Sequence, residues 1–342
     1  MAYLDYAATT PLYPEVEEAM RPFLADTFGN PSGAHAAARS AKTALEEARE
    51  QIAGALGAEP SEIVFTAGGT EADNLAVKGG ARAARSAGLG DGVVTTGFEH
   101  KGVLAPCERL AADGFRVARV PVGADGVVDL DELARSLDDR TTVVSVMLVN
   151  NEVGTIQPLD AVADLVRAGA PHAVLHTDAV QAVPWLDVAG ATARADLVSL
   201  SAHKFGGPKG VGVLVRKRDV PIEPLIEGGG QEWGLRSGTA NVAGAVGIAT
   251  ALRVTTERRA SEVARVGALR DRLTEGLAER VPDCFVNGDV ARKVAGNCHV
   301  GFRGVEAEAL LALHDRDGVY AAAGSSCTSG ATEPSHVLSA MG

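Results

Sequence analysis

The sequence has few residues of several kinds, and each shortage excludes a class of protein. Only four of its 342 residues are cysteine, and none forms a CxxC pair or a Cys/His cluster with zinc spacing, so no metal site is expected. Free thiols suit a reducing compartment, and we expect a cytoplasmic protein. Lys and Arg number 32 against 44 Asp and Glu, which disfavours a nucleic-acid groove as the main site.

Long apolar runs and nucleotide motifs are missing as well. No run reaches the length of a membrane span, and the first residues show no basic stretch followed by an apolar one, so we expect neither a membrane nor a secretory signal. A glycine-rich stretch at 206–210 lacks Walker spacing, and no GxGxxG opens a helix after a first strand. With 46% hydrophobic and 22% charged residues, the chain is typical of a globular protein with ample core.

Short β-branched runs alternate with alanine-rich stretches of helical spacing. Helices are predicted over 71–87 and 159–168, and Asp129 with Glu132 resembles a capping box. Apolar strands separated by helices predict an α/β fold, with a mainly parallel sheet covered on both faces. The predicted strands are Ile63–Thr66, Val93–Thr96, Arg116–Val120, Thr142–Leu148, Val174–Thr177, Leu197–Ser201 and Val211–Val215.

The sequence pattern changes near Asn241. A long helical pattern runs from there to about Arg280, and shorter strand-like pieces follow at 285–287, 298–302 and 319–322, with a helix at 306–314. We therefore expect a large domain over residues 15–245 and a smaller α+β domain formed by residues 1–14 and 246–342.

Lys204 carries the strongest local signal. It follows the apolar run 195–200 and lies between His203 and a glycine-rich turn. A lysine at the end of a buried strand suits Schiff-base chemistry, because a desolvated amine loses its proton and becomes nucleophilic. Pyridoxal 5′-phosphate (PLP) enzymes need such a lysine, phosphate donors and an acid against the pyridine nitrogen. The alternative is a surface lysine in a loop.

Other polar motifs follow the predicted strands, where ligands bind in open α/β sheets. Ala67–Asn74, with Gly69 and Thr70, can form an anion site at a helix start or an ordinary turn. His100 can stack on a cofactor and carry protons, or be a loop residue with satisfied polar atoms. Asn150–Gly154 offers carboxamides or simply a turn. Asp178 can pair with a pyridinium nitrogen or cap a helix.

Together, in this order, the motifs resemble the NifS/IscS-type cysteine desulfurases, PLP enzymes of fold type I among the class V aminotransferases. The resemblance covers essentially the whole chain. Its motifs are LDYAATTP (4–11), FGNPSGAH (28–35), GGTEADNLA (68–76), EHKGVL (99–104), NNEVGTIQP (150–158), TDAVQA (177–182), SAHKFGGPKG (201–210), GGGQEWGLRSGT (228–239), GSSCTSG (324–330) and CTSGATEPSHVL (327–338).

The resemblance implies a role for each site residue. Lys204 would hold PLP covalently, His100 would stack on its ring and move protons, and Asp178 would pair with the pyridine nitrogen. Gln181 would donate to the phenolate oxygen, and Asn151 would lie beside the cofactor and the substrate carboxylate. The remaining roles are phosphate binding by Thr70, Ser201, His203 and nearby backbone amides, phosphate binding across a homodimer interface by Thr239, and a substrate border formed by Asn30 and residues 7–10.

Cys327 distinguishes a desulfurase within the wider family. A thiol attacks as its thiolate, and a stretch of small residues such as GSSCTSG suits a thiol that reaches a pocket and then an acceptor. The resemblance implies that sulfur passes from L-cysteine to Cys327, leaving alanine and a persulfide. A sulfur acceptor or iron–sulfur scaffold protein would then take the sulfur. A structural role suits Cys107, Cys284 and Cys298 better, because their surroundings are apolar.

One departure from the family pattern leaves alternatives. The family has an arginine for the substrate carboxylate beyond the position of Gly342, so we expect a small domain incomplete at its C-terminal side. Two minor departures are Trp233, where an arginine is common, and Ser326, where an alanine is common. The alternatives to a cysteine desulfurase are a selenocysteine lyase or other class V PLP enzyme, and an inactive scaffold that binds sulfur acceptors.

Overall fold

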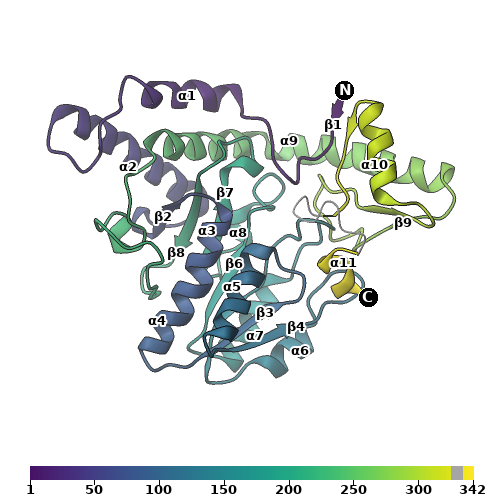
Figure 1. The fold of residues 1–342 in the computed structure, drawn as a ribbon, viewed down its shortest axis with the longest axis horizontal. Coiled ribbons are helices and arrows are strands. Elements are labelled where there is room, and N and C mark those ends of the chain that lie inside the picture. The colour runs from purple at the N-terminus through teal and green to yellow at the C-terminus, as the bar shows by residue number, and fades with distance from the viewer. Residues whose placement is uncertain (325–333) are drawn as a thin grey trace.

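A seven-stranded sheet forms the centre of the molecule (Figure 1). The computed structural model describes residues 1–324 and 334–342. Strand β8 runs antiparallel to β2 and β7, while the other neighbouring strands are parallel. Across the sheet the order is β2 (Ile63–Thr66), β8 (Gly212–Arg216), β7 (Leu197–Ser201), β6 (Val174–Asp178), β5 (Thr141–Ser145), β3 (Gly92–Thr96) and β4 (Arg116–Val120).

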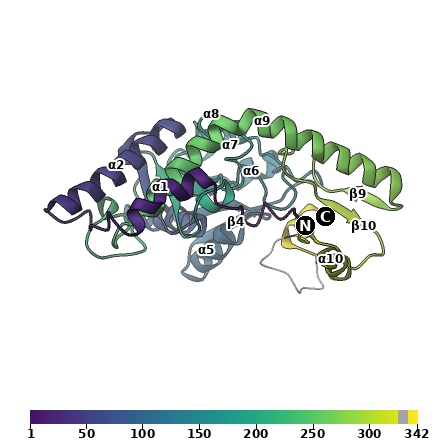
Figure 2. The same ribbon diagram turned by 90° about the horizontal axis from the view of Figure 1, so that it is seen from above.

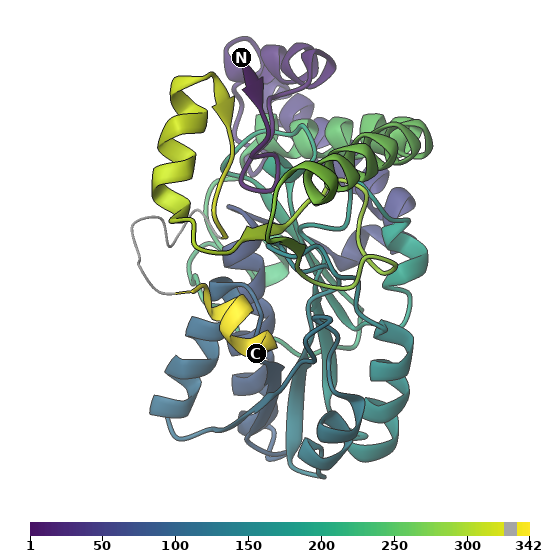
Figure 3. The same cartoon turned by 90° about the vertical axis from the view of Figure 1, so that its right-hand side faces the viewer.

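Alternate residues along the strands pack on opposite faces of the sheet, as the two-residue period of a strand requires. Val93 and Val143 join a core cluster with helix α5, and their neighbours Val94 and Val144 join the large cluster that contains α7. Helices therefore cover both faces, which Figure 3 shows with the sheet between them. This confirms the predicted α/β fold.

The helices that cover the sheet begin where local chemistry predicts. Asp129 caps α6 by accepting from the backbone N–H groups of Asp131 and Glu132. Helix α3 continues through a π-helical segment, η2, into α4 without leaving the helical region. The bounds are α1 (Pro14–Leu24), α2 (Ala36–Leu56), α3 (Gly69–Asn74), η2 (Leu75–Gly79), α4 (Gly80–Ser86), α5 (Lys101–Ala112), α6 (Leu130–Ser136), α7 (Leu159–Gly169) and α8 (Val188–Ala191). Short 3-10 turns are η1 (Pro60–Glu62), η3 (Ala202–Lys204) and η4 (Glu232–Gly234).

The long helix α9 (Val242–Arg280) connects the sheet region to the C-terminal elements (Figure 2). Its first half is buried and packs on α1 and α2, while its second half is largely exposed. Beyond it lie β9 (Cys284–Val286), β10 (Val300–Phe302), α10 (Ala307–Arg316), β11 (Val319–Tyr320) and α11 (His336–Met341). Strand β1 (Ala2–Tyr3) pairs with β11, so the N-terminal strand lies beside this region. The two-domain division stays a prediction.

The largest difference from the predicted elements is the strand predicted over Thr142–Leu148. Strand β5 ends at Ser145, but residues 146–148 continue to pair with β6: Val146 N–H donates to His176 O at 3.1 Å and Leu148 N–H to Asp178 O at 2.9 Å. Within the described residues, no helix combines the length and apolarity that crossing a membrane requires.

Candidate active site

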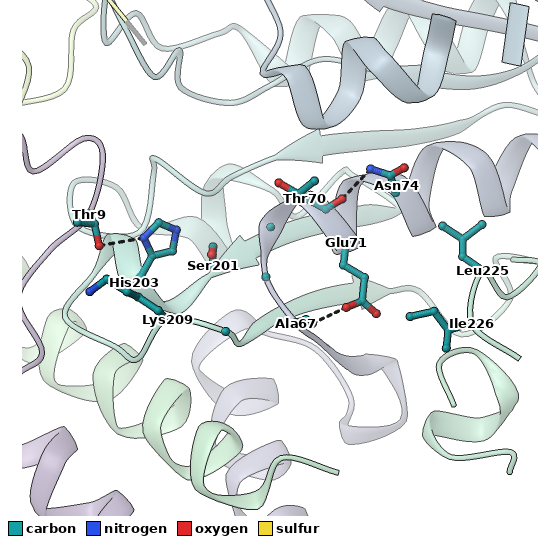
Figure 4. Close-up of a pocket in the computed structure, with 13 residues that line it drawn as sticks. Thr9, Ala67, Thr70, Glu71, Asn74, Ser201, His203, Lys209, Leu225 and Ile226 are labelled. Carbon is teal, nitrogen blue, oxygen red and sulfur yellow. Dashed lines mark hydrogen bonds between the residues drawn. The ribbon is translucent and has the colours of Figure 1, made fainter. Parts of the chain in front are cut away.

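A pocket of about 730 Å³ opens at the carboxyl ends of β2 and β7 (Figure 4). Three sequence motifs that are far apart in the chain meet there: the turn before α3, the segment 201–210, and the N-terminal loop that contains Thr9. Its lining residues are Thr9, Ala67, Gly68, Gly69, Thr70, Glu71, Asn74, Ser201, His203, Lys209, Gly210, Leu225 and Ile226. Of the predicted phosphate ligands, Gly69, Thr70, Ser201 and His203 are thus brought together.

The turn before α3 depends on its glycines. Gly68 has φ +156°, and a Cβ on Gly69 would lie 2.8 Å from Val180 Cγ2, so only glycine lets this backbone pack so closely. The turn is held by Glu71, whose carboxylate accepts from Ala67 N–H at 2.6 Å and pairs with Arg236 at 2.8 Å. The N–H groups at the start of α3 are therefore positioned at the pocket wall, where helix starts favour anions.

His203 and Lys204 both contact the N-terminal loop. His203 Nδ1 lies 3.1 Å from Thr9 Oγ1 (Figure 4), and burial lowers the pKa of its imidazole to about 4, so the ring is neutral at physiological pH. Lys204 Nζ donates to Ala7 O at 2.5 Å and to Ala8 O at 2.9 Å. Gln181 Nε2 donates to the same Ala7 oxygen at 2.9 Å. The predicted lysine and glutamine thus converge on one loop.

Beside the pocket, outside its lining residues, lies a group of buried and half-buried titratable side chains that forms the inner end of the site. Asp178, at the end of β6, accepts from Val180 N–H at 2.9 Å, and atoms of Asp73, His100 and Asp178 lie within 4.8 Å of one another. Burial raises the pKa of Asp178, against the opposing effects of His100 and Lys204. Burial also lowers the pKa of His100, whose ring caps α5 through Gly102 N–H. His100 is therefore a neutral imidazole next to a buried acid.

Comparisons with known proteins agree with this geometry. The model of the family "Aminotransferase class-V" matches residues 2–342. "Cysteine desulfurase IscS" from Dictyoglomus turgidum is 44% identical over 99% of this chain and 85% of its own length. "IscS-like cysteine desulfurase" from Mycobacterium tuberculosis is 47% identical over 100% of this chain and 88% of its own. The chain belongs to the class-V aminotransferases, among the IscS-type cysteine desulfurases.

Solved structures support the same assignment for this cysteine desulfurase. One described as "NIFS-LIKE PROTEIN" superposes with a TM-score of 0.93, at 38% identity, over 99% of this chain and 89% of its own. Another, "SspA in complex with cysteine", has a TM-score of 0.86 at 34% identity, over 100% of this chain and 94% of its own. The fold predicted from the motifs, that of NifS-like PLP enzymes, is confirmed.

PLP is the cofactor that the family implies, and the residues of this desulfurase fit it. A buried carboxylate is costly unless it is paired, and the side chain of Asp178 accepts one backbone N–H, from Val180. A protonated pyridine ring would supply a cation for it. The glycine turn and the neutral, hydrogen-bonding His203 in the pocket suit a phosphate. The pocket and the buried groups beside it therefore match the two polar ends of PLP.

Of the remaining predicted residues, Asn151, Asn30 and Thr239 are not among those that line this pocket. Asn151 is half-buried, and its Oδ1 has no hydrogen-bond partner among the described residues. Asn30 is exposed and accepts from Ser32 N–H, and Thr239 is exposed and does not line the pocket of its own chain. Cys327 lies outside the described residues, as does all of 325–333. The roles of these residues stay predictions.

The sequence analysis assigned no role to two buried acids, Asp73 and Glu99. Both lie inside quoted motifs, GGTEADNLA and EHKGVL, and both are fully buried. Burial raises the pKa of Glu99 to about 8, although Thr96 Oγ1 and Met147 N–H donate to it. An acid at an apolar position of a helical pattern is the signal that could have identified Asp73.

Proposed function

We propose that this chain transfers sulfur from L-cysteine to its own Cys327, releasing L-alanine. The observation that carries this is the convergence of Lys204, His100 and Asp178 at one edge of the sheet in a desulfurase fold. The solved structure titled "SspA in complex with cysteine" supports cysteine as the substrate class.

Each end of the site would hold one part of PLP. Thr70, Ser201, His203 and the backbone at Gly69 would bind the phosphate, joined by Thr239 from the partner of a homodimer. Asp178 would pair with the pyridine nitrogen, Gln181 would donate to the phenolate oxygen, and Lys204 would hold the cofactor covalently. When bound, PLP supplies an electron sink for the substrate's α-carbon.

Proton movement falls to Lys204 and His100. His100 is neutral at physiological pH because burial lowers its pKa, and Gly102 N–H donates to its Nδ1, so Nε2 carries the ring proton and can donate it to the substrate. The Ala7 and Ala8 carbonyls orient the Lys204 amine by accepting hydrogen bonds from it. Asn151 and Asn30 border the substrate.

The sulfur transfer balances without an external oxidant. The thiolate of Cys327 attacks the sulfur of the substrate, an S–S bond forms and the substrate Cβ–S bond breaks. The electron pair of that bond returns to carbon, which takes up a proton and becomes the methyl group of alanine. Cys327 is left as a persulfide, and an acceptor thiol or iron–sulfur scaffold protein takes its outer sulfur.

Two substitutions test this assignment together. Lys204→Ala should lose both PLP attachment and alanine formation. Cys327→Ser should still bind PLP, yet form no protein persulfide after a cysteine pulse, because a hydroxyl without its own base is a poor nucleophile. Cys284→Ser, on β9, is the matched control and should behave like the unchanged protein. A persulfide mapped by mass spectrometry to Cys107, Cys284 or Cys298 would contradict the role of Cys327.

A separate experiment tests the proposed homodimer. Thr239→Ala should weaken PLP binding although the residue does not line its own pocket. Mixing Thr239→Ala subunits with Lys204→Ala subunits should restore part of the activity only if Thr239 acts across the interface. A monomer by sedimentation with full PLP occupancy would refute the shared site.

A further inference from the structure

A chain of buried polar side chains lies behind Asp178, and the proposed chemistry does not use it. It consists of Ser145 on β5, His176 on β6, Ser199 on β7 and Asp73 on α3. Their exposed fractions are 0%, 0%, 0% and 1%. The burial of four polar side chains needs a structural or functional reason, because unsatisfied buried polar groups are costly.

The contacts in this chain are continuous across three neighbouring strands. Ser145 Oγ lies 2.8 Å from His176 Nδ1, and His176 Nε2 lies 3.0 Å from Ser199 Oγ. Ser199 adjoins the Asp73 carboxyl group, whose Oδ1 accepts no hydrogen bond from a described residue and lies 3.7 Å from His176 Nε2. A Cβ on Gly102 would lie 2.7 Å from Asp73 Oδ2, so α5 also packs directly against this carboxyl group. Asp73 is thus fixed in one place.

The charges around Asp73 and Asp178 indicate which of these two acids keeps a proton. Asp73 and Asp178 lie within 4.8 Å of each other, and two such carboxylates cannot both be charged in a dry site. Asp178 has His100 and Lys204 as favourable neighbours. The groups facing Asp73 are Asp178, Glu99, His100 and His176, of which the first two are acids.

We infer that Asp73 is a positioning residue that keeps its proton and is held by Ser199, His176 and Ser145, so that Asp178 alone carries negative charge towards the cofactor ring. Burial together with Asp178 raises the pKa of Asp73 well above its usual range, and burial lowers the pKa of His176 to about 3. Burial therefore favours the neutral form of both groups. The link to the ring rests on the proposed function, whereas the charge of Asp73 does not.

The protonated form predicts the direction of every hydrogen bond in the chain. Asp73 O–H donates to Ser199 Oγ, the Ser199 hydroxyl donates to His176 Nε2, and His176 Nδ1–H donates to Ser145 Oγ. A charged Asp73 would instead accept from Ser199, which reverses all three bonds and moves the imidazole proton to Nε2. The tautomer of His176 therefore reports the charge of Asp73.

Nitrogen NMR of the PLP-free protein at pH 7 reads this tautomer directly, with the signal assigned by its loss in His176→Gln. We expect a neutral ring protonated at Nδ1. A ring protonated at Nε2, or at both nitrogens, would overturn the inference. This measurement needs neither activity nor a variant of Asp73 that folds.

The stability of Asp73→Asn against pH is the second readout. An acid whose pKa is raised by folding loses stability as pH rises from its unfolded value, about 3.9, towards its folded value. Asp73→Asn removes that loss, so its stability relative to the unchanged protein should grow between pH 4 and pH 8. Asp138→Asn is the control, because Arg116 lowers the pKa of Asp138 and the resulting stabilisation is complete above the unfolded value of about 3.9, so its gap should stay nearly constant between pH 4 and pH 8. A gap for Asp73→Asn that also stays constant over this range would show that Asp73 does not keep its proton.

Absorbance of the PLP-loaded protein tests the link to the cofactor. Asp73→Asn mimics the protonated acid, so its PLP affinity should stay within roughly threefold. Loss of PLP binding in this variant, with the two PLP-free readouts as expected, would overturn the role towards the ring and leave the charge of Asp73 standing. Failure of the proposed function itself would instead appear as loss of alanine formation by the unchanged protein.

Discussion

The two ends of the site, the open pocket and the buried group beside it, hold their polar groups by different means. At the outer end, Thr70 and His203 lie on an open pocket wall, positioned by turns of the local backbone. At the inner end, Asp178, Asp73 and Glu99 are at most 4% exposed and are positioned by α3, α5 and β6 together. The outer end is accessible to solvent as a surface loop is, and the inner end is buried as a protein core is.

The difference decides how much each group contributes. Water and salt screen charges at the outer end, so several weak donors share the binding of an anion. At the buried inner end an uncompensated charge costs several kcal/mol, so the gain or loss of a single proton changes the stability of the site. We therefore expect large, pH-dependent effects from the inner residues and small, salt-dependent effects from the outer ones.

The largest effect should come from Asp178→Ala. Removing one partner of a buried charge pair costs about 3–5 kcal/mol, so alanine formation should fall by at least roughly 100-fold. PLP should still attach to Lys204, because the phosphate ligands are unchanged. Absorbance of the loaded protein and alanine release measure the two parts separately, and activity within about threefold of normal would contradict the assignment of Asp178.

Glu99→Gln should reveal the burial of the inner end through the pH dependence of stability. Burial raises the pKa of Glu99 to about 8, so its carboxyl group costs stability increasingly as pH rises from about 4.3 to 8. The neutral variant avoids this cost. Its free energy of unfolding should match that of the unchanged protein at pH 4 and exceed it by about 1–3 kcal/mol at pH 8. A constant gap across this range would mean that Glu99 does not titrate there.

Ser201→Ala should have a moderate effect at the outer end. A hydrogen bond to a charged group contributes about 1.5–3 kcal/mol, so PLP affinity should fall roughly 10- to 100-fold. Ser40→Ala, an exposed serine on α2, is the control and should leave affinity unchanged. Equal affinity of both variants for PLP, measured by fluorescence titration, would exclude Ser201 as a phosphate ligand.

The smallest effect should come from Arg236→Gln. The Arg236–Glu71 pair is partly exposed, and such pairs contribute about 0–1 kcal/mol, so stability should change little. The substitution leaves Glu71 negative at the pocket wall, which should weaken PLP binding a few-fold at low salt. Added salt should remove most of the difference because it screens the repulsion. A salt-independent loss would indicate a structural role for Arg236 instead.

Particular elements show which parts of the fold are readable from sequence. The predicted strands 63–66, 116–120 and 197–201 match β2, β4 and β7 residue for residue, because their apolar runs are bounded by turns and caps. The run 142–148 was predicted as one strand, yet β5 ends at Ser145 while pairing continues through Leu148. Strand ends depend on neighbours from distant sequence, which local patterns do not contain.

The sequence by itself determined the fold class, the family and the identity of the chemical groups, since each motif is local and follows its own strand. Only the tertiary structure decided their charges. Asp73 and Glu99 read as ordinary acids in the sequence, and their raised pKa values arise because helices and strands distant in the chain exclude water from them. Protonation depends on surroundings in space, and no stretch of a sequence carries those surroundings.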